Sequence, residues 1–328
     1  MNRTGLVLYH GIQTGPELKQ YGRIAEACGY ESLWVTERYF HEEIFSLLGY
    51  LGAATETIRL GVGVTNPYSR HPALLAMAAA TLDRITDGRF IMGLGRSERD
   101  VIQGRMGMPY GDAPAVMSEA VSLLKALLGG KKVSRSEGNF KIRDTRLATL
   151  PVQSDLPIYL AAIGNKGLDL AGAIADGVVL NAYVPPAYVE YAVSRIRKAA
   201  VRAGRDPKGI DIACMVVIRL TNDPGSMMLT LKKRIVRLLS EPYVGEILLE
   251  KGGFDDSVLP AIRRSFAKDD GDSGKGLITD EMVESFYVIG DERKCKARVE
   301  AYRRAGVDVP LILPRLEDYE RVANALRP

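Results

Sequence analysis

The segment from Ile58 to Glu98 reads IRLGVGVTNPYSRHPALLAMAAATLDRITDGRFIMGLGRSE and decides the fold. It predicts an apolar strand over residues 58–64, a helix over 73–85 whose apolar residues recur at helical spacing, and a second apolar strand over 89–94. Two buried strands joined by a helix form a parallel βαβ unit. Both strands therefore end at the same edge of the sheet.

Polar side chains follow both strands at that shared edge. Glycines at the two strand ends allow a ligand to approach the backbone closely. We therefore expect the rim of an active site here, with these polar members: Thr65, Asn66, Ser69, Arg70, Ser97 and Glu98.

The alternation of strand and helix continues through the whole chain. Eight strands are predicted at 5–9, 32–35, 58–64, 89–94, 157–162, 178–180, 210–220 and 309–313. Eight strand–helix units indicate a (β/α)8 TIM barrel, an α/β fold. A doubly wound sheet is the alternative, but no strand is followed by a clean GxGxxG with an acid about 20 residues further on.

We expect one barrel domain over residues 1–328 with two insertions. Residues 131–150 alternate polar and apolar around Glu137-Gly138-Asn139, which predicts a hairpin. Residues 240–285 contain DDGDSGKG and are expected to be an irregular loop or helical insertion, either a flexible segment or a lid.

Composition excludes several classes of protein. The net charge is only +4 and short basic runs are scattered, which disfavours nucleic-acid binding. The three cysteines are far apart without a CxxC motif and indicate reduced thiols, not a disulfide or zinc site. No apolar run approaches the length of about 20 residues that a membrane span needs. We expect a soluble, cytoplasmic protein.

The predicted strand ends offer few groups that carry chemistry on their own. His10, Glu37 and Glu98 lie there, but the three histidines share no metal-ligand spacing. We find no lysine placed for a Schiff base and no convincing Ser–His–Asp arrangement. A site that lacks its own nucleophile and metal usually uses an organic cofactor.

Four segments carry a resemblance to a known family. They are CGYESLWVTER, LGVGVTNPYSRHPA, ATLDRITDGRFIMGLGRSE and IADGVVLN. Together they resemble the bacterial-luciferase-like superfamily, and most closely its branch that uses the deazaflavin coenzyme F420, typified by methylenetetrahydromethanopterin reductase. The resemblance implies an oxidoreductase that moves a hydride between C5 of F420 and a small organic substrate.

The resemblance also implies roles for particular residues. A non-prolyl cis peptide at Gly63-Val64 would press on the centre of the flavin ring, and Thr65 and Asn66 would bond its pyrimidine edge. Glu98 would handle the substrate's proton. The coenzyme phosphate would meet backbone amides of the fifth-strand loop, with an asparagine at the next strand end. Those residues are Ala162, Ile163, Gly164, Asn165 and Asn181.

One departure from the family pattern concerns the second strand. Relatives often carry an acid–histidine pair there, whereas this chain has Glu37-Arg38, and arginine cannot act as a base. His41 could compensate, and Arg38 could grip an anionic group. Structural roles stay open as well. Glu37 could cap a helix or pair with Arg38, Glu98 could complement a helix dipole, and a packing role is open for His10.

Two further functions remain as alternatives. An FMN-dependent luciferase-like monooxygenase would use the same fold, and so would a flavin-binding protein without catalytic activity. The sequence does not specify the substrate, and a pterin, an alcohol, a sugar phosphate or a ring enone would all be compatible. By resemblance we expect a homodimer formed through the early helices.

Overall fold

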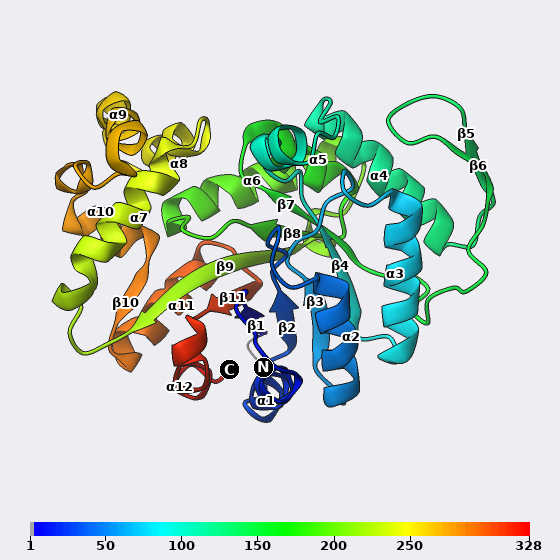
Figure 1. Cartoon of the computed structure of the whole chain (residues 1–328), viewed down its shortest axis with the longest axis horizontal. Coiled ribbons are helices and arrows are strands. Elements are labelled where there is room, and N and C mark those ends of the chain that lie inside the picture. The colour runs from blue at the N-terminus through cyan, green and yellow to red at the C-terminus, as the bar shows by residue number, and fades with distance from the viewer. Residues whose placement is uncertain (1–2) are drawn as a thin grey trace.

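The computed structural model describes residues 3–328 and contains the eight predicted barrel strands in the predicted order. They are β1 (Gly5–Leu8), β2 (Ser32–Val35), β3 (Arg59–Val62), β4 (Phe90–Leu94), β7 (Ile158–Ala162), β8 (Gly177–Leu180), β9 (Asp211–Leu220) and β11 (Val309–Leu313). Each pairs in parallel with the next, and β11 pairs with β1, so the sheet closes into a (β/α)8 barrel (Figure 1).

Helices surround this barrel (Figure 1), and the C-terminus lies beside the last of them. The helices are α1 (Gly15–Ala27), α2 (Ile44–Ala54), α3 (Pro72–Ile85), α4 (Ala113–Leu128), α5 (Asn165–Ile174), α6 (Pro186–Arg202), α7 (Met228–Ser240), α11 (Glu292–Arg304) and α12 (Tyr319–Ala325). Local sequence fixes several starts. Thr14 and Glu17 form a capping box before α1, and Asp112 caps α4.

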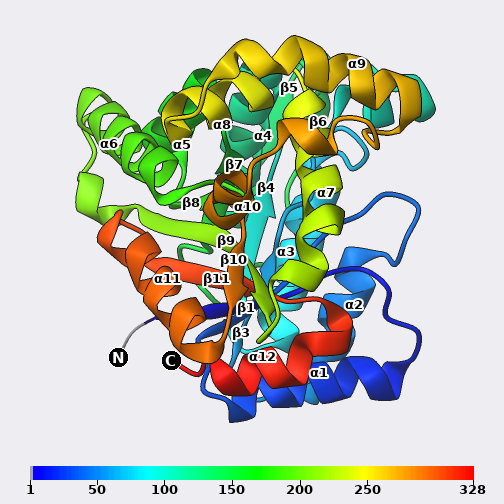
Figure 2. The same ribbon diagram turned by 90° about the vertical axis from the view of Figure 1, so that its left-hand side faces the viewer.

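The two insertions differ in how well the sequence describes them. The predicted hairpin is present, because β5 (Val133–Arg135) pairs antiparallel with β6 (Ile142–Thr145). The second insertion is more regular than expected. It contains α8 (Val244–Gly252), α9 (Leu259–Asp269), α10 (Asp280–Phe286) and the strand β10 (Val288–Gly290). All three helices pack on α7, and Figure 2 shows them around it.

The second insertion is the helical one of the two alternatives expected there, although the sequence did not locate its individual helices. Its helices have 9, 11 and 7 residues, too short for a long apolar repeat to stand out in the sequence. They gain stability by burying Leu248, Ile262 and Met282 against their neighbours. β10 pairs with the last three residues of β9, so it extends the sheet beyond the barrel.

Polar groups tie the N-terminal ends of the strands together. Trp34 fills the barrel interior and its ring lies 5.6 Å from that of Tyr159, whose hydroxyl donates to Asp211. Arg3 donates to Asp211 at 2.7 Å and to Glu31 at 2.8 Å. These bonds join residues in, or directly before, three different strands. This end of the barrel therefore stabilises the fold. The opposite end, where the strands finish, carries function in such barrels.

Candidate active site

A backbone bulge forms the rim between β3 and β4. The peptide bond between Gly63 and Val64 is cis, which confirms the conformation predicted by resemblance. The chain then rejoins β4. The Thr65 amide donates to the Gly93 carbonyl at 3.0 Å, and the Gly95 amide donates to the Thr65 carbonyl at 2.7 Å. Val64 is half-buried at the rim.

Two glycines of β4 and its end make room for this bulge. A Cβ atom on Gly93 would lie 1.8 Å from the Val62 carbonyl oxygen and 2.9 Å from Val64 Cγ1. A Cβ atom on Gly95 would lie 2.7 Å from Val64 Cγ2. All three distances are shorter than a van der Waals contact. The bulge therefore rests directly on the backbone of β4, and this surface depends on the absence of both side chains.

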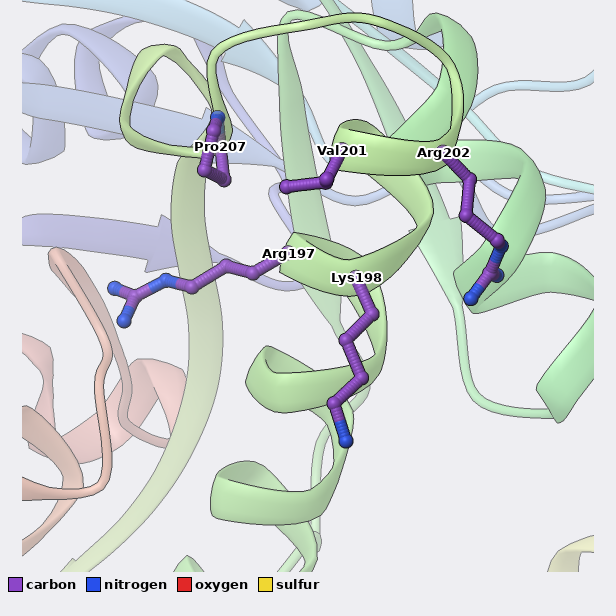
Figure 3. Close-up of a pocket in the computed structure, with 5 residues that line it drawn as sticks. All are labelled: Arg197, Lys198, Val201, Arg202 and Pro207. Atoms are coloured by element: carbon purple, nitrogen blue, oxygen red, sulfur yellow. The ribbon is translucent and has the colours of Figure 1, made fainter.

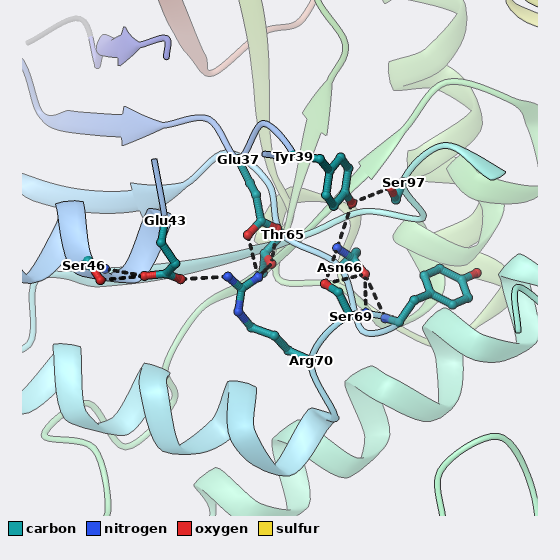
Figure 4. A network of polar contacts seen from close by, with 10 residues as sticks. Glu37, Tyr39, Glu43, Ser46, Thr65, Asn66, Ser69, Arg70 and Ser97 are labelled. Atoms are coloured by element: carbon teal, nitrogen blue, oxygen red, sulfur yellow. Dashed lines mark hydrogen bonds and ion pairs between the residues drawn. The ribbon is translucent and has the colours of Figure 1, made fainter. Parts of the chain in front are cut away.

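Glu37 is held by neighbours on both of its oxygens (Figure 4). The Thr65 hydroxyl donates to one oxygen at 2.6 Å, and the Arg70 guanidinium donates to the other at 2.5 Å. Arg70 also pairs at 2.7 Å with Glu43, whose carboxylate caps α2. Glu37 thus neither caps α2 nor pairs with Arg38. Its side chain is only 8% exposed, and it fixes the loop that carries Thr65.

The Asn66 side chain is engaged by its own loop (Figure 4). Its amide nitrogen donates to the Tyr39 hydroxyl at 2.8 Å and to Ser69 Oγ at 3.0 Å. Its oxygen accepts from the backbone amides of Tyr68 and Ser69, both at 2.9 Å. The side chains of Thr65 and Asn66, which we expected to meet a flavin ring, therefore bond within the protein and shape the rim from below.

Tyr39 belongs to this network, although the sequence analysis did not single it out. Its hydroxyl donates to Ser97, which follows β4, so it joins the ends of β2, β3 and β4. Burial raises the pKa of Tyr39 to about 12, and the hydroxyl stays protonated over the pH range of ordinary assays. Tyr39 directly follows the polar Thr-Glu-Arg at the end of the second predicted strand, and this position could have indicated that it belongs to the site.

His10 follows β1 and lies in a cluster of polar side chains. An Arg38 guanidinium nitrogen lies 2.5 Å from His10 Nε2, and the His41 ring lies 4.5 Å from that of His10. Burial lowers the pKa of His10, the charges of Arg38 and His41 lower it further, and Glu42 opposes them. Arg38, which stands where the resemblance implies a histidine, thus favours a neutral, hydrogen-bond-accepting His10.

This environment predicts a pH dependence of stability. The folded-state pKa of His10 lies below its usual value of about 6.5. The contribution of the neutral ring to stability is therefore complete above that pH and is lost as the pH falls from there through the folded-state value. The wild type should lose more unfolding free energy than His10→Gln when the pH is lowered from about 7.5 to 5.5. The difference should be less than ~1 kcal/mol, since the ring is partly solvated. Urea unfolding at both pH values measures this. An unchanged pH dependence would contradict the assigned environment.

Glu98 lies exposed after β4, just before a π-helical turn over Asp100–Arg105. Its carboxylate makes no hydrogen bond or ion pair with any residue of the described range 3–328. The junction between α7 and α8 is nearby. Partial desolvation and then the negative charge of Glu98 raise the pKa of Glu241 at that junction. Glu98 is therefore a free carboxylate between the barrel rim and the insertion.

The loop after β7 ends in an uncapped helix. Gly164 occupies the N-cap of α5 and offers no side chain, so the first amides of α5 keep their donors free of a side-chain cap. The Ile163 carbonyl accepts from the Tyr188 hydroxyl at 2.6 Å, and the Asn165 side chain accepts from Tyr191. Ala162 is buried at the end of β7. An anion is stabilised at such a helix start.

The neighbouring elements enclose this helix start. A Cβ atom on Gly164 would lie 3.9 Å from Ile247 Cδ1, so α8 of the insertion packs over the loop. Asn181, at the end of β8, is exposed, and its side-chain oxygen accepts from the Ala182 amide at 2.9 Å. The structure therefore brings the β3 bulge, the α5 start and Asn181 to the same end of the barrel.

A comparison with protein families gives one match over most of the chain. Residues 2–309 match the profile described as luciferase-like monooxygenase. The chain belongs to this family. The resemblance inferred from sequence motifs is thereby confirmed.

Individual members of the luciferase-like family narrow the relationship. The chain is 33% identical over 301 residues to 5,10-methylenetetrahydromethanopterin reductase of Methanolobus tindarius, covering 90% of each chain. It is 31% identical to the Archaeoglobus fulgidus protein of the same name, covering 89% and 87%. The solved coenzyme F420 dependent tetrahydromethanopterin reductase of Methanopyrus kandleri superposes with a TM-score of 0.86 at 26% identity, covering 99% and 96%.

These relatives establish that this luciferase-like protein is an enzyme, an oxidoreductase. An F420-dependent secondary alcohol dehydrogenase has a TM-score of 0.78 at 17% identity and supports the fold. Among residues 3–328, no helix combines the length and the apolar composition needed to cross a membrane.

Figure 3 shows a shallow depression formed by α6 and the segment that follows it. Its lining consists of Arg197, Lys198, Val201, Arg202 and Pro207. Helix α6 starts after the end of β8 and finishes just before β9 begins, so its last turns lie toward the N-terminal ends of the strands. Because chemistry in this fold occurs at the other end, we assign the depression no part in the reaction.

Proposed function

We propose that this oxidoreductase uses coenzyme F420 and transfers a hydride between C5 of the deazaflavin and a small organic substrate. A pterin of the methylenetetrahydromethanopterin kind is the first candidate, because relatives at 33% and 31% identity bear that name. The observation that carries the proposal is the continuous surface from the Val64 bulge across Gly95 to the end of β7. A Cβ atom on Gly95 would contact Val64 on one side and Ala161, at 3.5 Å, on the other.

The residues present fit a deazaflavin with a phosphate-bearing tail. The glycine-supported bulge at Val64 offers a smooth apolar surface for a ring, and the α5 start at Gly164 offers free amides for a phosphate. Lys166 is the lone cation within the AIGNKG loop, and nearby Arg195 is already paired with Asp169. This modest positive charge fits a singly charged phosphodiester better than a phosphate dianion.

When bound, the deazaflavin supplies a carbon-centred hydride donor or acceptor. The chain's own residues position that ring and keep water away. Glu37, Thr65 and Arg70 hold the rim rigid through their ion pair and hydrogen bond. A fixed rim holds the reacting atoms at a defined separation, which is a large source of rate enhancement.

Glu98 is the group proposed to move the substrate's proton. Unlike Glu37, whose oxygens accept from Thr65 and Arg70, Glu98 has a free carboxylate at the barrel mouth. A carboxylate that is not held by a cation can accept and return a proton at a substrate atom. His10 lies at the same end of the barrel and is a second candidate for this role, but its Nε2 already faces the Arg38 guanidinium.

An anaerobic reaction assay tests the proposed function. Reduced F420 is mixed with the protein and with methylenetetrahydromethanopterin, and oxidation is followed by the return of the coenzyme's visible absorbance. A secondary alcohol with oxidised F420 and a ring enone with reduced F420 are run in parallel. Substrate-dependent turnover of F420 supports the proposal. Turnover that requires reduced FMN and oxygen would instead assign the chain to the monooxygenases.

We also propose that two copies associate through α3. Three apolar side chains on this helix are more than half exposed: Leu74, Met77 and Ile85. Exposed apolar side chains that share one helix indicate a binding surface. We expect a dimer by light scattering, and Leu74→Glu with Met77→Glu should yield a monomer. Val201→Glu, at an equally exposed position on α6, is the control and should remain dimeric. A monomeric wild-type protein would contradict this proposal.

A further inference from the structure

Arg219 is a buried cation without an acidic partner. It lies near the end of β9 and is 5% exposed. One guanidinium nitrogen donates to the Ile218 carbonyl at 2.7 Å, and the guanidinium lies 5.5 Å from the centre of the Tyr287 ring. Within residues 3–328 no carboxylate lies at ion-pair distance from it. Burial lowers the pKa of Arg219, Tyr287 and Tyr183 oppose this effect, and the charges of Arg234 and Arg315 lower the pKa further.

Register places Arg219 at the mouth of the barrel, meaning the C-terminal strand ends and the loops that follow them. Met215 points into the barrel, because a Cβ atom on Gly63 would lie 3.3 Å from its Cε. Arg219 lies four residues further along β9, so strand alternation gives it the same side. Val217 pairs with Leu313, the last residue of β11, and Arg219 lies just beyond that level.

A buried hydroxyl group accompanies the arginine. Tyr287 is 2% exposed, and its hydroxyl has no hydrogen-bond partner of good geometry within the described chain. The ring of Tyr183, from the loop after β8, packs edge-on at 5.0 Å. Burying an unpaired charge and an unpaired hydroxyl costs free energy. No ion pair within the described part of the chain involves Arg219, and the proposed transfer of hydride and proton involves neither Arg219 nor the Tyr287 hydroxyl.

We propose that Arg219 and the Tyr287 hydroxyl bind an anionic group, a carboxylate or phosphate, of an acidic substrate. The forked guanidinium matches the two oxygens of such groups, and a phenol adds a third donor. Arg234, on α7, is exposed and has no ion pair among residues 3–328, so it adds positive charge near the entrance. Such a site would restrict the substrate of the proposed reaction to compounds with an acidic group. This inference therefore rests on the proposed function.

We assign the anion to the substrate because the coenzyme's phosphate has another place. The free amides of α5 follow β7, whereas Arg219 is on β9, with β8 between them. Neighbouring strands lie about 4.8 Å apart, and the two positions are two strands apart. The two anions could therefore be bound at once.

The test uses inorganic phosphate and glutarate as probes, titrated by calorimetry into protein saturated with F420. Arg219→Met should weaken binding of at least one probe by about tenfold or more, and Tyr287→Phe by about threefold. Arg197→Gln removes an exposed cation on α6 and should change nothing. Since Arg219→Met deletes an unpaired buried charge, its melting temperature without ligand should equal or exceed that of the wild type. Tyr287→Phe decides the matter if Arg219→Met does not fold.

Each outcome separates the possible sources of the anion. Equal probe affinity in wild type, Arg219→Met and Tyr287→Phe would overturn the site. A tenfold loss of F420 affinity in Arg219→Met with unchanged probe binding would show that the arginine binds the coenzyme. It would overturn the proposal that Arg219 binds the substrate. If F420 does not bind, the proposed function fails. Arg219-dependent phosphate binding to the coenzyme-free protein would then still support the anion site.

Discussion

Gly93→Ala is expected to abolish coenzyme binding and to destabilise the protein. The added Cβ atom would lie 1.8 Å from the Val62 carbonyl oxygen, which is backbone and cannot move as a side chain can. Either β4 or the Val64 bulge must shift, and overpacking of this kind costs about 3 kcal/mol or more of unfolding free energy. A displaced bulge removes the surface on which the ring is proposed to rest. Denaturant unfolding and F420 fluorescence titration measure the two effects.

Substitutions at two other glycines serve as comparisons for Gly93→Ala. The Cβ atom of Gly95→Ala would clash only with the Val64 side chain, at 2.7 Å, and its distance of 3.5 Å from Ala161 Cβ is an ordinary contact, so the effects should be smaller than those of Gly93→Ala. A Cβ atom on Gly209 has no neighbour within 4 Å, and Gly209→Ala should leave both stability and affinity unchanged. If Gly93→Ala binds F420 as tightly as Gly209→Ala, the bulge does not support the coenzyme.

Glu98→Gln is expected to lower kcat by about 10²–10⁴-fold while F420 affinity stays the same. The amide keeps the size and polarity of the side chain but cannot carry the substrate's proton. The neighbouring acid Asp100 is also exposed, and it pairs with Arg105. Asp100→Asn is the matched control and should retain activity within about threefold. Steady-state kinetics with the substrate found by the anaerobic assay provide the measurement.

The contrary result would have a definite meaning. Equal kcat in Glu98→Gln and wild type would leave Glu98 only the role of a charge near the start of a helical turn. Proton movement would then pass to His10. A loss of F420 affinity in Glu98→Gln would indicate instead that the carboxylate positions the coenzyme.

The fold could be predicted because its signals are local and repeated. Each barrel strand is a short apolar run, and each following helix has an apolar stripe with a recognisable end. The long β9 and the crossover helix between β3 and β4 illustrate this, since both were expected at nearly their observed bounds. For the second insertion, the sequence predicted a loop or helical segment but not the bounds of its helices, because they are short and lie beside a stretch rich in glycine and aspartate.

The site could be predicted in position but not in detail. Strand ends follow from the sequence, so Glu37, Thr65 and Glu98 were placed at the correct end of the barrel. Which partner each side chain chooses depends on residues far apart in the chain. Glu37 pairs with Arg70, 33 residues away, and Tyr39 bonds Ser97, 58 residues away. Such pairings arise only when β2, β3 and β4 lie side by side in the folded sheet, and no local sequence pattern predicts them.

Competitive titration of the purified protein with F420 and FMN tests the central claim most directly. Quenching of intrinsic or coenzyme fluorescence gives the two dissociation constants under the same conditions. We predict micromolar binding of F420 and at least ~100-fold weaker binding of FMN, a difference of about 2.7 kcal/mol. Tighter binding of FMN than of F420 would contradict the account and place the protein with the flavin monooxygenases of its family.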